Sequence, residues 1–288
     1  MPDVNAVRLP VRRPAHAAAV AALVANVLIV LTGALVRLTG SGLGCPTWPS
    51  CTDDSFVTTP EMGVHGVVEF GNRVLGIVVG LVTLALVVAV ARHRARPPKS
   101  LPLAVGVLVG VGLQGLIGGL SVRRALAPEI VAVHFLTSMV LVAALVVLVD
   151  LLGRPDAVSR PPANLRVRLG VGALPVALTA VMVLGTLVTG SGPHAGDENA
   201  RRFGFDPADL TAAHVLAVVV MVGLQLGTAV LVRSLAAVAL LALSIVQGVI
   251  GSVQEALALP VPLVAAHVVT AAVIVAATAH LVVRTFRS

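Results

Sequence analysis

The sequence predicts an all-α integral membrane protein whose eight transmembrane helices form two tandem four-helix bundles related by a pseudo-twofold axis. Of the 288 residues, 57% are hydrophobic and 11% are charged, with a mean hydropathy of +1.01; an ordinary soluble domain has about 25% charged residues. The apolar residues form eight long runs, and the first four runs resemble the last four. This composition excludes a soluble enzyme, a disordered chain and a nucleic-acid-binding domain.

Eight segments are apolar enough to cross a bilayer as helices, which takes about 20 residues each. We place them at 17–38, 66–91, 102–121, 130–151, 169–189, 211–232, 235–252 and 261–283. The first segment is a helix rather than a signal peptide, because its apolar run is long and no small-residue cleavage site follows it. Long apolar runs without strict alternation also exclude a transmembrane β-barrel.

The distribution of charge predicts the orientation of the bundle. Most of the 20 Lys and Arg residues fall in segments that are cytoplasmic if both termini are inside the cell, and most acidic residues fall at the opposite helix ends. Positively charged residues favour cytoplasmic loops. We therefore expect a multi-pass protein of the cell membrane with both termini cytoplasmic. The pI of about 11.3 does not indicate nucleic-acid binding, because the charges are few and scattered.

An internal repeat divides the chain. Gln114-Gly-Leu-Ile-Gly-Gly in the third segment matches Gln247-Gly-Val-Ile-Gly-Ser in the seventh, and each glutamine precedes a histidine, His134 or His267, at the same spacing. Both copies begin on the same side, so the repeat is parallel and its axis lies along the membrane normal. We divide the chain into an N-terminal four-helix half (1–151), a cytoplasmic linker (152–168) and a C-terminal four-helix half (169–288).

Two cysteines, Cys45 and Cys51, lie in the sequence GLGCPTWPSC of the first external loop. An external loop is in an oxidising compartment, and prolines bend the chain between the two residues, so we expect a disulfide. Free or metal-binding thiols are the alternative. The sequence leaves open whether such a bridge is only structural or is redox-active.

Three histidines, His134, His214 and His267, lie near the external ends of their helices and share one depth in the membrane. Ionisable groups inside a membrane are costly, so three at one depth indicate a cofactor. Haem suits paired imidazoles between apolar helices, whereas zinc needs three or four ligands in a tetrahedron. A proton relay or structural hydrogen bonding is the alternative interpretation.

The two halves differ in their expected ligands. In the C-terminal half, His214 and His267 predict one six-coordinate haem b. In the N-terminal half, His134 corresponds to His267, but Asn72 stands where the counterpart of His214 is expected, and His65 lies two turns away. Either His65 or Asn72 makes the second contact to that haem, or His134 binds it alone. An iron with a weak or missing second ligand can react, whereas an iron with two imidazoles mostly carries electrons.

Charged residues near the same ends have two interpretations each. Glu69 either pairs with Arg73, four residues further along the helix, or moves protons beside a haem. Arg37 and Arg73 either clamp haem propionates through bidentate hydrogen bonds or anchor the helices at the membrane interface.

Together these motifs resemble those of the haem A synthase family, of the actinobacterial type, over all eight segments. The resemblance rests on TGSGLGCPTWPSC, on Glu69 in the second segment and on the three histidines. It implies an oxidoreductase that oxidises a methyl group of haem O to the formyl group of haem A by successive hydroxylations, for cytochrome oxidase assembly. It further implies haem b between His214 and His267 and catalytic work by Glu69.

The resemblance also implies partners, and the chain departs from the family pattern at Asn72. Haem O is the substrate and haem A the product, bound near His134 toward the outer face, with haem O supplied by a haem O synthase and electrons exchanged with an unidentified donor or acceptor. The bilayer is a further partner, nucleic acid is not, and a homo-oligomer is compatible with the sequence. The family carries His-Arg where this chain has Asn72-Arg73.

Two other functions share part of this pattern. A di-haem b membrane cytochrome that exchanges electrons with a quinone would use the same histidines but convert no haem. A transporter built from two repeats would place polar groups near the membrane midplane, where this chain is almost purely apolar.

Overall fold

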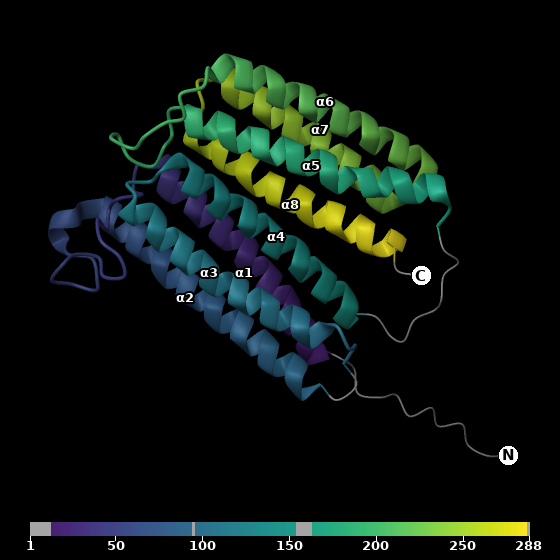
Figure 1. The fold of residues 1–288 in the computed structure, drawn as a ribbon, viewed down its shortest axis with the longest axis horizontal. Helices are drawn as coiled ribbons and strands as arrows, with labels where there is room; N and C mark the ends of the chain where they lie inside the picture. The colour runs from purple at the N-terminus through teal and green to yellow at the C-terminus, as the bar shows by residue number, and fades with distance from the viewer. Residues whose placement is uncertain (1–12, 94–95, 154–162, 287–288) are drawn as a thin grey trace.

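The computed structural model describes residues 13–93, 96–153 and 163–286. Within these ranges the chain forms eight long helices and one short 3-10 helix, and no strand occurs there (Figure 1). In chain order they are α1 (Arg13–Leu38), η1 (Pro60–Met62), α2 (Gly63–Arg92), α3 (Ser100–Arg123), α4 (Pro128–Gly153), α5 (Leu165–Ser191), α6 (Pro207–Val232), α7 (Leu235–Ala256) and α8 (Val261–Phe286).

All eight long helices are long and apolar enough to cross a membrane. This confirms the predicted all-α, multi-pass membrane protein. The helices extend a few residues beyond most of the predicted segments, and α2 begins at Gly63 rather than near residue 66. The apolar runs define only the part within hydrocarbon, whereas backbone hydrogen bonds continue the helix into polar flanking residues.

Polar side chains fix where three of the helices begin. The side chains of Asn164, Asp206 and Ser234 accept hydrogen bonds from backbone N–H groups in the first turns of α5, α6 and α7. Such caps satisfy donors that the helix itself leaves unpaired. Ser234 follows Arg233, whose left-handed backbone ends α6, so α6 and α7 turn back on each other within two residues.

The helices gather into two groups, α1 to α4 and α5 to α8 (Figure 1). In the first group α1 packs against α2 and α4, and α3 packs between α2 and α4; in the second, α5 packs on α6 and α7 on α8. The groups meet through α1, α4 and α8. Because 44% of the apolar window of α4 is buried, against 17% to 33% for the others, α4 lies at the centre. The predicted linker falls mostly on residues 154–162, outside the described residues.

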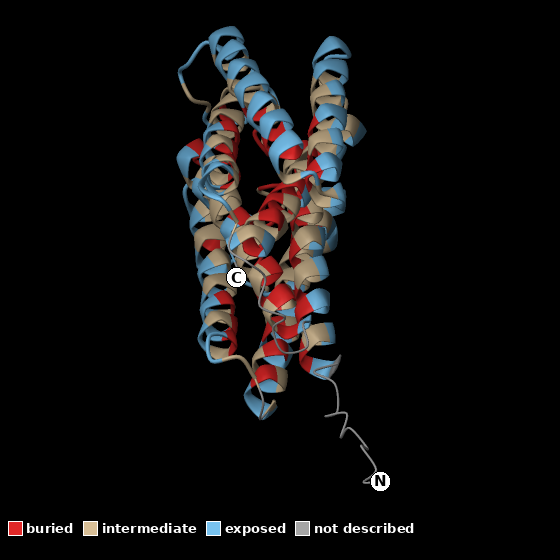
Figure 2. Cartoon of the chain, turned by 90° about the vertical axis from the view of Figure 1, so that its right-hand side faces the viewer, coloured by how far each residue is buried: buried red, intermediate tan, exposed pale blue. Residues whose placement is uncertain are grey.

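Small residues allow the central helices to pack closely. Ala15, Ala19 and Ala22 lie along one face of α1 and are almost fully buried with Leu145 and Leu148 of α4. Lipid gives apolar helices little reason to associate, so close van der Waals packing of this kind must hold the bundle together. Figure 2 shows buried residues along the middle of the bundle and exposed residues on its outer helices.

Two turns of unusual geometry occur at matching places in the two groups. Residues 125–126, after α3, and 258–259, after α7, are both Ala-Leu pairs with positive φ angles between 48° and 61°. In both turns the leucine N–H donates to a carbonyl at the helix end over 2.7 Å, from Leu126 to Ser121 and from Leu259 to Gln254. Left-handed residues commonly end helices in this way, and their recurrence is consistent with the predicted repeat.

Candidate functional site

Most of the candidate residues from the sequence collect at one end of the bundle. We call it the disulfide end and define it by the two connecting segments that lie there, 39–59 and 192–206 (Figure 1). The odd-numbered helices end there and the even-numbered ones begin there, so side chains from both groups of helices meet these segments.

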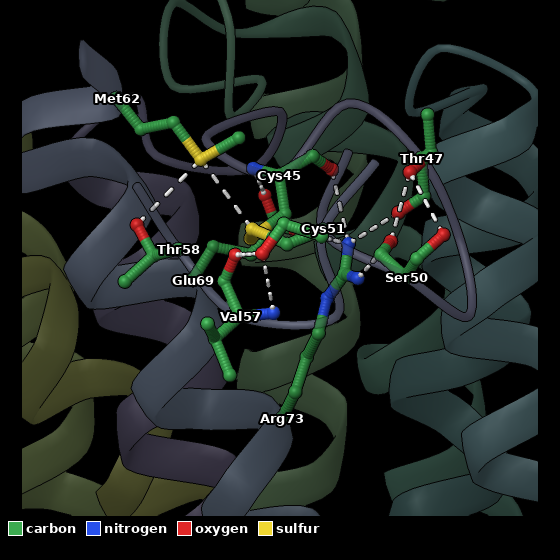
Figure 3. The surroundings of a disulfide bond; sticks show 10 residues. Cys45, Thr47, Ser50, Cys51, Val57, Thr58, Met62, Glu69 and Arg73 are labelled. Atoms are coloured by element: carbon green, nitrogen blue, oxygen red, sulfur yellow. Dashed lines mark hydrogen bonds and ion pairs between the residues drawn. A yellow bond between two sulfur atoms is a disulfide. The ribbon is translucent and has the colours of Figure 1, made fainter. Parts of the chain in front are cut away.

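The predicted disulfide between Cys45 and Cys51 is present, and both residues are fully buried (Figure 3). It closes the loop CPTWPSC between α1 and α2. The Sγ atom of Cys51 lies 3.4 Å from the Sδ atom of Met62, just before α2. The bridge therefore packs against the beginning of the helix that carries Glu69.

The side chains of Glu69 and Arg73, on α2, form hydrogen bonds with the backbone of this loop (Figure 3). The Oε2 atom of Glu69 accepts a hydrogen bond from the Cys45 N–H at 2.7 Å, and its Oε1 atom accepts one from Nη2 of Arg73 at 2.6 Å. The same guanidinium donates to the carbonyls of Cys45, Thr47 and Ser50 over 2.9 to 3.1 Å. Glu69 is only 5% exposed.

The contacts of Glu69 bear on both interpretations of this residue. The pair with Arg73 is present, and it connects one turn of α2 to both sides of the disulfide loop. A buried charge of this kind needs its partner, because the carboxylate loses its hydration on burial. These bonds use Nη1 and Nη2 of Arg73, so a haem propionate would have to bind another N–H group of the guanidinium or replace a loop carbonyl.

Arg37 joins the two groups of helices at the same end. Its Nε atom donates to the carbonyl of His194 at 2.5 Å and its Nη2 atom to that of Thr189 at 2.9 Å. Nearby, the N–H of Gly42 donates to the carbonyl of Gly196 at 2.8 Å. Partial burial and the charge of Arg37 lower the pKa of His194, so its imidazole is neutral near pH 7. Arg37 thus fixes the second connecting segment to α1.

The ring of Trp48, inside the disulfide loop, lies directly on Gly119 of α3. A Cβ atom added at Gly119 would lie 2.3 Å from two atoms of the indole ring, a distance that no side chain could tolerate. The matching position in the C-terminal half is Ser252, where no such loop exists. The disulfide loop is thus docked on α3 as well as on α2.

We expect Gly119→Ala to displace Trp48 from α3. Forcing a methyl group into a packed contact costs about 1–3 kcal/mol, which is enough to undock a short loop. Because Trp48 is the single tryptophan of the chain, its emission in the haem-free protein should shift to the red. Gly112→Ala is the matched control, since nothing lies within 4 Å of a Cβ there. Identical spectra for the two variants would contradict the contact.

His134 lies against Gly118, the glycine that precedes Gly119 on α3. A Cβ at Gly118 would lie 3.5 Å from Cε1 of the imidazole. Gln114 donates through Nε2 to the backbone carbonyl of His134 at 2.9 Å and to Oγ of Ser138 at 2.6 Å. The Nδ1 atom of His134 is buried and has no hydrogen-bond partner within the described ranges.

His267 repeats this arrangement in the C-terminal half. A Cβ at Gly251 would lie 3.1 Å from its Cε1, Gln247 donates to its backbone carbonyl at 2.8 Å, and its Nδ1 atom is again buried and unpartnered among the described residues. The repeated Gln-Gly-x-Ile-Gly motif therefore has a local reason. Its glutamine holds the backbone of the histidine, and its second glycine leaves room for the ring.

His214 approaches His267 from α6. Its Nδ1 atom lies 3.1 Å from the carbonyl oxygen of Val181, and a Cβ at Gly185 would lie 3.2 Å from its Cε1. A donor Nδ1–H at that carbonyl leaves Nε2 as the nitrogen with a lone pair.

The structure separates Asn72 from His65, the two alternatives in the N-terminal half. Asn72 lies against α1, where its Oδ1 atom accepts a hydrogen bond from the Thr32 hydroxyl at 2.7 Å. His65 is exposed at the beginning of α2, and its Nδ1 atom lies 2.9 Å from Oγ of Ser41 in the connecting segment. The side chain of His65 therefore contacts the connecting segment rather than the interior of the helix bundle.

These residues fit a haem group better than a bare metal ion. Three imidazoles each lie against a glycine, and two of them have a buried ring nitrogen without a partner among the described residues. Buried polar atoms rarely stay unpaired without a reason. No group of three or more His, Cys, Asp or Glu in the described part of the chain could hold a metal ion, as a zinc site would require.

A second polar group lies at the opposite end of the bundle. His16, Asp150, His280 and Arg284 line a cavity of about 400 Å³ between α1, α4 and α8. A Cβ at Gly153 would lie 2.7 Å from Nε2 of His16. Helices from both halves contribute to this cavity, which is why no single segment of the sequence indicates it.

The fold and this end define a multi-pass membrane protein in which two groups of four helices present histidines beside a disulfide-closed loop. More particularly, the chain belongs to the cytochrome oxidase assembly protein family (COX15-CtaA), whose sequence profile matches residues 17–196. That match includes the disulfide loop, Glu69, Asn72 and His134. It stops before His214 and His267.

Several similar proteins carry the name heme A synthase. The protein from Symbiobacterium thermophilum is 34% identical over 170 residues, which are 56% of this chain and 54% of that protein. Those from Alkalihalophilus pseudofirmus and Halalkalibacterium halodurans are each 30% identical, over 42% and 48% of this chain and 40% and 45% of theirs. The chain spans about half the length of the curated relatives it matches.

Proposed function

We propose that this protein is a haem A synthase, an oxidoreductase of the cell membrane that oxidises a methyl group of haem O to the formyl group of haem A by successive hydroxylations. The observation that carries the proposal is the set of three glycine-backed imidazoles from both halves at the disulfide end. Membership of the cytochrome oxidase assembly family and the name of its relatives support the same activity.

In this proposal the two halves have different roles. His214 and His267 hold haem b in the C-terminal half (169–288), and His134 holds the substrate haem in the N-terminal half (1–151). A haem iron with two imidazoles supplies electron transfer. The hydrogen bond of His214 to Val181 and those of the two glutamines to the histidine backbones orient the rings.

The disulfide loop closes the substrate side. Trp48 contacts Gly119 and His134 contacts Gly118, so the loop and the substrate imidazole pack on the same turn of α3. Glu69 is positioned by the Cys45 N–H and Arg73, and we assign to it the movement of protons at the substrate. Arg37 and Arg73 already donate to backbone carbonyls, and their remaining N–H groups could meet haem propionates.

The disulfide supports an orientation of the protein in the membrane. Disulfides persist in oxidising compartments, so the disulfide end faces outward and both termini are cytoplasmic. Haem O then comes from a haem O synthase in the same membrane, and electrons pass to or from a further carrier. A homo-oligomer is compatible with this arrangement.

The test is to identify the haems that the protein binds and makes. We would produce the full chain in a host that contains haem O synthase, purify it in detergent, extract the haems and identify them by chromatography and mass. Haem B together with haem O, its hydroxylated form or haem A is the expected result.

Two other results would overturn the proposal. Haem B alone, at two per chain, would favour the di-haem electron-transfer cytochrome, which shares the histidines but not the conversion. A protein without haem would favour a transporter instead.

A further inference from the structure

We propose that His134 is the single protein ligand of the haem iron in the N-terminal half, so that the two halves hold haems of different coordination. The inference deepens the proposed function and rests on haem binding at this end. It is carried by the hydrogen bonds of Asn72 and His65, which remove both alternatives for a second ligand.

Asn72 occupies the position in the N-terminal half that His214 occupies in the other half. His214 reaches the carbonyl of Val181 on α5. The corresponding residue of α1 is Ile29, four residues before Gly33 as Val181 is four before Gly185. The Thr32 hydroxyl lies 3.3 Å from that Ile29 carbonyl and 2.7 Å from Asn72. The one hydroxyl hydrogen of Thr32 has these two oxygens as alternative acceptors, so Asn72 contacts α1 at the threonine beside the matching carbonyl.

Asn72 cannot take the chemical role of His214 from this position. An amide nitrogen carries hydrogens and no available lone pair, so Asn offers a metal only its Oδ1 atom. That oxygen is the acceptor for Thr32. The axial ligands of haem iron are His, Cys, Met or Tyr side chains, and Asn is not among them.

His65 cannot replace it, because the loop fixes it elsewhere. Seven residues separate His65 from Asn72, which is about 10 Å along a helix axis. The ring is exposed and bound to Ser41. The backbone of His65 is also fixed, since a Cβ on Gly44 would lie 2.2 Å from its carbonyl oxygen. The first turn of α2 therefore cannot shift toward Asn72 without moving the disulfide loop.

The other candidates at this end are engaged or distant. Glu69 is held by Cys45 and Arg73. Of the eight histidines in the chain, His16 and His280 line the cavity at the opposite end. His93 follows α2 at that same opposite end. His194 lies in the segment between α5 and α6, where Arg37 binds its carbonyl.

The spin state of the bound haems tests this inference without measuring activity. The full chain would be purified, brought to two haems per chain by added haem, and examined in the ferric state by electron paramagnetic resonance and absorption. We expect about half of the iron to be low-spin, from the site with two imidazoles, and about half to be high-spin, from the site with one.

Variants then assign each signal to a half. His134→Ala should remove the high-spin signal, and His214→Ala should remove the low-spin one. His65→Ala, His194→Ala and Asn72→Ala should leave both signals in place. Asn72→His places an imidazole at the position matching His214, so it should convert the high-spin signal to low-spin.

Three results would overturn the inference. Two low-spin haems in the unmodified chain would leave haem binding intact but show a second ligand in the N-terminal half. A low-spin signal lost in His65→Ala or His194→Ala would identify that ligand. A second haem that binds equally well to His134→Ala would remove His134 from the site. A chain that takes up no haem is a different failure, because it would overturn the proposed function itself. The haem content therefore distinguishes a failure of the inference from a failure of the proposed function.

Discussion

Glu69→Ala is expected to lower the conversion of haem O by at least about 100-fold, the lower end of what a general acid or base contributes. It is also expected to loosen the disulfide loop. The substitution leaves Arg73 without its carboxylate and the Cys45 N–H without its acceptor. Removal of one partner of a buried ion pair costs about 3–5 kcal/mol, and here the cost falls on the contact between the loop and α2.

The two effects can be separated by Glu69→Gln. Glutamine can still accept a hydrogen bond from Cys45 but carries no charge and no proton to give. Conversion would be measured by haem extraction, and loop docking by Trp48 emission and by the rate at which a water-soluble phosphine reduces the disulfide. Loss of conversion with a docked loop supports proton transfer by Glu69. Full conversion by Glu69→Gln would limit Glu69 to a structural role. Glu61→Ala is the control, because Glu61 is an exposed carboxylate in η1, just before α2.

The number, type and order of the helices could be predicted because the bilayer leaves few alternatives. A spanning segment in hydrocarbon must satisfy its own backbone hydrogen bonds, so each long apolar run becomes a helix. The helix ends were less predictable. They depend on caps such as Asp206 and on the left-handed turn at Ala125 and Leu126, which lie outside the apolar pattern.

The repeat predicted His134 and His267 as an equivalent pair, and each of them has the same kind of glutamine and glycine contacts in the structure. It did not indicate Trp48, because a loop has no periodicity from which its contacts can be read. One signal was available: the motif has Gly119 in one copy and Ser252 in the other. A glycine present in only one copy points to a contact that only that half makes.

Charged residues were the hardest to interpret from the sequence. The i, i+4 spacing of Glu69 and Arg73 correctly suggested a pair, but Arg73 also binds three carbonyls of a loop more than 20 residues earlier. Arg37 likewise binds carbonyls more than 150 residues away. A guanidinium has five donors and accepts almost any oxygen, so only the fold decides which partners it finds.

Gly251→Val is expected to remove the haem of the C-terminal half as completely as His267→Ala does. The first atom of any side chain there would lie 3.1 Å from Cε1 of His267, and the branched valine adds two methyl groups that a helix holds in one rotamer. The imidazole would have to turn away from His214. An axial ligand acts only in one orientation, so the low-spin signal should be lost while the chain stays inserted in the membrane.

Gly248→Val is the matched control, because it lies on the same helix and in the same motif but nothing lies within 4 Å of a Cβ there. The N-terminal half allows the same comparison, with Gly118 against His134 and Gly115 open. A Cβ atom at Gly118 would lie 3.5 Å from Cε1 of the histidine, against 3.1 Å at Gly251. Gly118→Ala should therefore be tolerated better than Gly251→Ala. Haem content per chain measures all of these variants, and the low-spin absorption bands report on those in the C-terminal half. An unchanged haem content in Gly251→Val would mean that the second glycine of the motif serves helix packing and not the histidine.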